Sequence, residues 1–114
     1  MTRASPGTSY ELDPECALPP HLLRLFLRSA PGQLQELVNA CDARDFEAAR
    51  AQAHKLKGGL YAAGARRLAD DVEALRTALK ASAWPAVLQH LSLIRREFAR
   101  LLGELGRRLS EGGA

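Results

Sequence analysis

One segment of the chain combines an imidazole, cationic side chains and unusually placed glycines. His54 is followed by Lys57 three residues later and by Gly58 four residues later. On a helix, residues three and four apart are neighbours, so all three lie within about one turn. Histidine is the side chain whose unperturbed pKa, about 6.5, leaves it mostly neutral at pH 7 and free to act as a nucleophile. The spacing makes His54 the first candidate for chemistry in this sequence.

Two adjacent glycines, Gly58 and Gly59, follow this histidine inside a predicted helix. Each glycine costs roughly 1 kcal/mol of helix stability relative to alanine. The chain contains 20 alanines, so alanine is common in its helices. A glycine is favoured despite this loss of stability where something must approach the helix backbone closely. The pair therefore indicates close approach beside His54.

A helical wheel predicts which way these residues point. Four apolar residues cluster on one side of the helix, which we expect to face the core: Ala49, Ala53, Leu56 and Leu60. At 100° per residue, His54 lies about 130° from the centre of that cluster and points to solvent. Arg50 and Gly58 are one turn before and after it, and Lys57 and Tyr61 lie on the adjoining strip.

The composition predicts a purely helical scaffold for this segment. The 114 residues suffice for one domain, and they include 20 Leu and 20 Ala but only seven β-branched residues. A sheet needs more β-branched residues than this, so the composition argues against an all-β or α/β fold. The net charge of +3 is modest and spread along the chain, which gives little support for nucleic-acid binding.

Apolar periodicity predicts four main helices and a short additional N-terminal helix. The short helix covers residues 20–30 and ends at Pro31-Gly32, and the next helix runs to about residue 43. Asp45 is the expected N-cap of the third helix and Gly64 its left-handed end. The fourth helix stops near Ser82, and the fifth carries an unbroken apolar seam. Short connections favour an antiparallel up-down-up-down four-helix bundle.

The expected organisation is a flexible leader over residues 1–17, the bundle over 18–109 and a flexible tail over 110–114. The leader has no apolar run, so it predicts no secretory signal and a cytoplasmic protein. In that compartment Cys16 and Cys41 are expected to be free thiols. No metal-ligand spacing connects these cysteines with the histidines, and His21 and His90 are interpreted as surface or boundary residues.

The segment Ala53-His54-Lys55-Leu56-Lys57-Gly58 resembles the histidine-containing phosphotransfer (HPt) family of two-component signalling, whose pattern is His-x-x-Lys-Gly. The Gly64-Ala65 pair about ten residues further on, with Leu68 and Leu75 after it, also fits the family. The resemblance covers about residues 18–105. Two positions depart from the family. Gly59 stands where the family often has Ser or Ala, and Arg76 stands where Gln or Glu is common.

The resemblance implies that His54 accepts a phosphoryl group from a receiver-domain aspartate and passes it to another receiver. It implies phosphoryl-stabilising or partner-docking roles for Lys57, Gly58, Arg50 and Tyr61. Arg76 departs from the family pattern, and its guanidinium could pair with the phosphoryl group instead; the sequence leaves open whether it does. The chain would be a carrier without autonomous catalysis. It would bind no cofactor itself, because the receiver brings the Mg²⁺.

The resemblance further implies response-regulator receivers as partners, and a hybrid sensor histidine kinase in cis or in trans. We expect a monomer that contacts neither nucleic acid nor membrane. The sequence leaves open which receivers are cognate, and whether the chain is free-standing or the C-terminal part of a hybrid kinase. Two other hypotheses also stay open. One is a non-catalytic bundle that binds a signalling partner through the same face, and the other is nucleic-acid binding through the arginines of the last helix.

Overall fold

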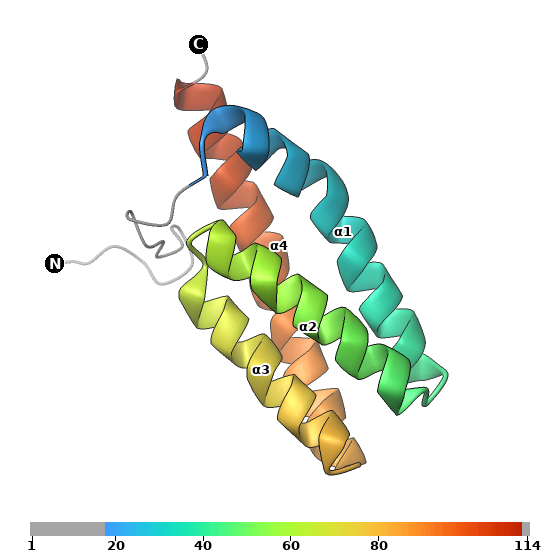
Figure 1. Ribbon diagram of the computed structural model, residues 1–114. Helices are drawn as coiled ribbons and strands as arrows, with labels where there is room; N and C mark the ends of the chain where they lie inside the picture. Colours follow the sequence, from blue (N-terminus) through green and yellow to red (C-terminus); the bar gives the residue numbers. More distant parts are fainter. Residues whose placement is uncertain (1–17, 113–114) are drawn as a thin grey trace, which may run out of the picture.

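Four α-helices make up the fold in the computed structural model, which describes residues 18–112. They are α1 (Pro20–Asp42), α2 (Phe46–Ala62), α3 (Arg66–Lys80) and α4 (Trp84–Gly112). No residue of this part of the chain lies in a β-strand, which confirms the predicted all-α class. α1 and α3 each pack against both α2 and α4, so the four helices enclose one core (Figure 1).

The first helix differs from the sequence prediction, because α1 continues through Pro31 as a single 23-residue helix. The prediction of a separate short helix over residues 20–30 is wrong. Proline in a helix interior removes a backbone hydrogen bond and costs about 3 kcal/mol. The helix continues because residues on both sides of Pro31 form one buried stripe, and each large apolar side chain there contributes about 1.5–3 kcal/mol. The buried residues of α1 are Phe26, Ala30, Leu37, Val38 and Cys41.

The core is built from leucine and alanine, as the composition predicts. Every apolar residue of the predicted seam in α4 is buried: Val87, Leu91, Ile94, Phe98, Leu101 and Leu105. The Cys41 thiol is also fully buried and free, and burial raises its pKa, so it stays protonated. Cys16 and the predicted leader lie outside the described residues.

The same three-residue turn joins each pair of consecutive helices. Its middle residue adopts the left-handed backbone conformation each time: Arg44 at φ 57°, Gly64 at φ 84° and Ser82 at φ 54°. In each turn the next residue donates its backbone N–H to a carbonyl five residues earlier, as Ala65 does to Leu60 at 2.8 Å. This bonding pattern satisfies carbonyls that a helix end would leave unpaired. The predicted left-handed end at Gly64 is confirmed.

The last helix is longer than expected. α4 continues to Gly112, so residues 110–112, predicted as part of the flexible tail, are helical. None of the helices in the described range, including the long α4, combines the length and apolarity needed to cross a bilayer.

The left-handed backbone conformation of the turns predicts opposite changes in the free energy of unfolding for substitutions at two of them. Gly64→Ala should lower the free energy of unfolding by about 1–2 kcal/mol, because a Cβ is strained at this φ. Ser82→Gly should raise it by up to about 1 kcal/mol, because it removes that strain from an exposed turn. Urea unfolding curves measure both changes. A stabilising Gly64→Ala or a destabilising Ser82→Gly would contradict this account of the turns.

Candidate functional site

The position of His54 follows from how α2 begins and which face it buries. Asp45 caps the helix as predicted, since its side chain accepts a hydrogen bond from the Ala48 backbone N–H at 3.1 Å. The buried residues of α2 are Ala49, Ala53, Leu56 and Leu60. His54 is exposed, as the helical wheel predicts.

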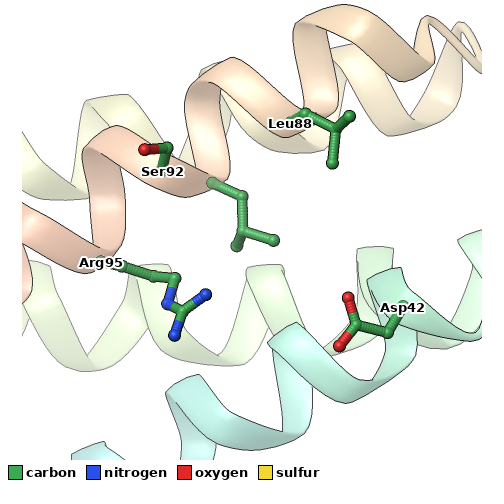
Figure 2. A pocket seen from close by; sticks show the side chains of 5 residues that line it. Asp42, Leu88, Ser92 and Arg95 are labelled. Atoms are coloured by element: carbon green, nitrogen blue, oxygen red, sulfur yellow. The ribbon is translucent and has the colours of Figure 1, made fainter.

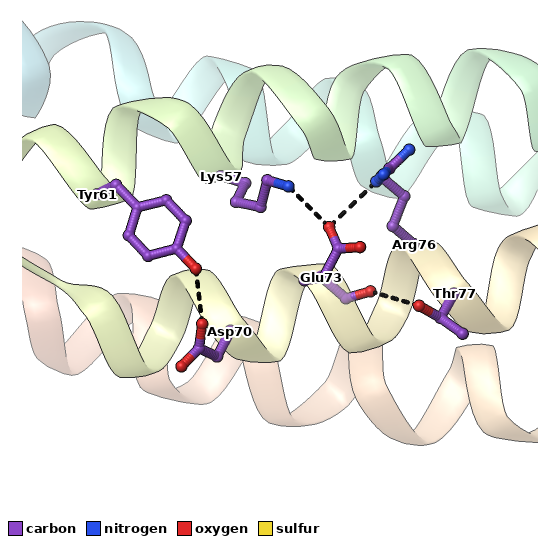
Figure 3. Close-up of polar contacts among 6 residues, drawn as sticks. All are labelled: Lys57, Tyr61, Asp70, Glu73, Arg76 and Thr77. Atoms are coloured by element: carbon purple, nitrogen blue, oxygen red, sulfur yellow. Dashed lines mark hydrogen bonds and ion pairs between the residues drawn. The ribbon is translucent and has the colours of Figure 1, made fainter.

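Lys57 and Arg76 meet at one carboxylate between α2 and α3 (Figure 3). The Lys57 Nζ donates to Glu73 Oε1 at 2.8 Å, and the Arg76 Nε donates to the same oxygen at 3.1 Å. Lys57 is on α2, while Glu73 and Arg76 are one turn apart on α3. The structure therefore brings two of the predicted site residues together, through a third residue that sequence reasoning missed.

Glu73 is the main addition to the predicted site. The hydrogen bonds from Lys57 and then Arg76 hold the pKa of its carboxyl below the ordinary value, so it is ionised at neutral pH. The spacing between Glu73 and Arg76 is an i, i+3 pair that the sequence could have revealed. Its approach to Lys57, 16 residues earlier, depends on how α2 and α3 pack and has no local sequence signal.

Tyr61, one turn after Lys57 on α2, also contacts α3; we call this line of polar contacts between the two helices the α2–α3 seam. Its side chain is partly exposed, and its hydroxyl donates to Asp70 Oδ1 at 2.7 Å (Figure 3). This hydrogen bond to Asp70 raises the pKa of the Tyr61 hydroxyl. Tyr61 is thus a surface residue anchored to α3, not part of the core.

The two cross-helix contacts fix the register of α2 against α3. Tyr61 lies opposite Asp70 and Lys57 opposite Glu73, so the helices run in opposite directions. One helical turn beyond Lys57 toward the start of α2 is His54, and one turn beyond Glu73 toward the end of α3 is the Arg76–Thr77 stretch. This register therefore places His54 at the same height as Arg76 and Thr77. Figure 3 agrees, because the Arg76 guanidinium extends toward α2 on the side of Lys57 away from Tyr61. Arg50 is half-buried one turn before His54.

The two glycines serve different surfaces. A Cβ added at Gly58 would meet no atom within 4 Å, so the fold itself does not require glycine there. A Cβ at Gly59 would lie 3.5 Å from the Phe26 ring of α1, which is ordinary van der Waals contact. The packing of the fold therefore requires glycine at neither position. An alanine at Gly59 would contact Phe26 without strain, and Gly58 leaves bare backbone facing solvent beside His54.

The other histidines and the arginines of α4 have different surroundings. His21 is exposed and His90 is half-buried, in line with their interpretation as surface or boundary residues. The buried Glu104 carboxylate accepts from both Arg107 and Arg108, and Glu97 accepts from Arg100. Three arginines of α4 thus pair with two carboxylates of the same helix, which weakens the case for a nucleic-acid surface.

A separate hollow of about 260 Å³ lies between the end of α1 and the first half of α4 (Figure 2). It is lined by Asp42, Leu88, Leu91, Ser92 and Arg95, none of which is a predicted site residue. Within residues 18–112 no group of three or more histidine, cysteine or acidic side chains is arranged to hold a metal ion.

Comparison with known families gives one clear result. The family model described as the Hpt domain matches residues 21–104, well over half of the chain. The matched range begins at the second residue of α1 and ends in the last third of α4, so it contains the entire α2–α3 seam. Comparisons with curated proteins and with solved structures give no significant match.

The open space at Gly58 predicts that alanine stabilises the fold there. Gly58→Ala should raise the free energy of unfolding by about 0.5–1 kcal/mol, because alanine loses less backbone entropy and meets no neighbour. Ala51→Gly, at an exposed position of the same helix, is the matched control and should lower it by a similar amount. Urea denaturation compares the two. A destabilising Gly58→Ala would show that the fold itself requires this glycine.

Proposed function

Because the chain belongs to the Hpt domain family, whose members are phosphoryl carriers in phosphorelays, we propose that His54 is its phosphoryl acceptor. The phosphoryl group comes from the aspartate of one response-regulator receiver domain and passes to another receiver. The observation that carries this proposal is the exposed imidazole of His54, with bare helix backbone at Gly58 one turn away. Such a surface lets a partner bring its own reactive group close to the ring.

The transfer needs little machinery from this chain. A ring nitrogen of neutral His54 attacks the phosphorus with its lone pair, so an N–P bond forms. The P–O bond of the receiver's acyl phosphate breaks, and the aspartate carboxylate leaves with the electron pair. The proton on the second ring nitrogen equilibrates with solvent, because the side chain is exposed. The reverse sequence delivers the group to the next receiver. The receiver would also supply a Mg²⁺ ion, whose charge would offset that of the phosphoryl group.

Lys57 and Arg76 are the groups that stabilise the transferred phosphoryl group. Lys57 is one turn from His54 on α2, and Arg76 is on α3 at the level that the register assigns to His54. Both are cations that form charge-assisted hydrogen bonds already, so both can donate to phosphoryl oxygens. Arg50 adds positive charge from the preceding turn, and Tyr61 belongs to the docking surface.

The proposal extends to the surroundings of the protein. The domain comprises α1 to α4, arranged as an up-down-up-down bundle, and acts as a monomer in the cytoplasm. It is either free-standing or the C-terminal part of a hybrid histidine kinase. Its partners are receiver domains, and a sensor kinase in cis or in trans is the source of the phosphoryl group.

Phosphotransfer from a labelled receiver tests the assignment of His54. The receivers of the source organism are phosphorylated in turn and mixed with the protein, and the label is followed by gel autoradiography. Wild-type protein should be labelled, and His54→Gln should not be, because the glutamine amide is not a nucleophile at phosphorus. His21→Gln and His90→Gln are matched controls and should be labelled like wild type.

Equal labelling of His54→Gln and wild type would overturn the proposal. If no receiver labels the protein but one binds it, and binding is indifferent to His54→Ala, the non-catalytic interaction bundle is the correct function instead.

A bulky residue at Gly58 should obstruct the receiver without disturbing the fold. Gly58→Gln should slow transfer from the cognate receiver by about tenfold or more, which corresponds to roughly 1.4 kcal/mol of lost interaction. Phosphorylation of the same variant by a small donor, phosphoramidate, should proceed at the wild-type rate. Wild-type transfer from the receiver would show that close approach is not the reason for glycine here.

A further inference from the structure

Glu73 is a carboxylate whose place in the site the transfer chemistry does not explain. One of its oxygens, Oε1, accepts from the Lys57 Nζ at 2.8 Å and from the Arg76 Nε at 3.1 Å. The three side chains are partly exposed, with relative exposures of 20% for Lys57, 36% for Arg76 and 41% for Glu73. The proposed cations of the phosphoryl site are therefore both held by one negative charge before any phosphoryl group arrives.

The net charge at this cluster falls from +1 to zero or below when His54 is phosphorylated. Two cations and one carboxylate carry a net charge of +1, so the cluster attracts an anion. A phosphoryl group carries between one and two negative charges at neutral pH. It would then compete with Glu73 for the same donors and would also be repelled by that carboxylate. The Lys57 and Arg76 side chains are long and partly exposed, so both can move from one acceptor to the other without unfolding a helix.

We propose that Glu73 is a positioning residue that limits how tightly the phosphoryl group is held on His54, by competing with it for Lys57 and Arg76. This inference rests on the proposed function. A relay intermediate must give up its phosphoryl group as readily as it accepts it, so cations that held the group too strongly would stop the relay. Glu73 holds the two donors in place when His54 is free and draws them back as the group departs.

The lifetime of the phosphorylated histidine tests this role without any partner protein. Phosphoramidate transfers its phosphoryl group to a histidine nitrogen and releases ammonia, so it loads the protein chemically. After removal of the donor, ³¹P NMR follows the loss of the phosphohistidine signal. Glu73→Gln should lengthen the lifetime by about two- to fivefold, the range expected for one partly exposed charge pair. Its ³¹P shift should also differ from wild type, because the phosphoryl oxygens gain donors.

Matched variants separate this role from a general effect of charge or stability. Glu97→Gln removes the same charge from a similar pair with Arg100 on α4, and it should leave the lifetime unchanged. In a Lys57→Ala, Arg76→Ala background, Glu73→Gln should change the lifetime much less, because the cations through which Glu73 acts are gone.

The possible outcomes distinguish this inference from the function on which it rests. If wild type gains no phosphohistidine that is absent from His54→Gln, the proposed function fails and this inference fails with it. If His54 is phosphorylated but Glu73→Gln has the wild-type lifetime, only the role of Glu73 is overturned. The role is also overturned if the full effect persists without Lys57 and Arg76.

Discussion

The rotation of α2 about its own axis is set by burial, and the arrangement of the working face follows from it. Ala49, Ala53, Leu56 and Leu60 are completely buried, so the helix cannot turn without exposing them. With that face fixed, the side chain of His54 points to solvent and that of Lys57 to α3, while the backbone at Gly59 faces α1. The two alanines contribute to this packing because small buried residues let α2 lie close to its neighbours.

The polar seam between α2 and α3 contributes little to stability and a good deal to geometry. Ion pairs between partly exposed side chains contribute about 0.2–1 kcal/mol, far less than the burial of one leucine. The Lys57–Glu73 pair is thus strong enough to select rotamers and weak enough to exchange partners. A phosphoryl carrier benefits from this combination, because its charge changes with every transfer while its fold must stay constant.

Much of the fold could be predicted from the sequence, and the failures have identifiable causes. Periodicity located the buried faces of α2 and α4, and Asp45 and Gly64 marked helix ends correctly. Pro31 predicts a break on its local cost alone, but burial of apolar residues on both sides of it keeps the helix continuous. At the site, the outward orientation of His54 followed from local periodicity. The contact of Glu73 with Lys57 depends on the register of two helices, which no local pattern encodes.

The single tryptophan of the chain lies at the end of the bundle where α2 and α4 begin. The Arg44 guanidinium lies 3.8 Å above the Trp84 ring, and the Phe46 ring is 6.0 Å away on the other helix. Phe46 is eight residues from His54, which is about 12 Å along the axis of α2. Intrinsic fluorescence from Trp84 therefore reports on the packing of this end of the bundle. The protein thus carries an optical probe of the contact between the starts of α2 and α4.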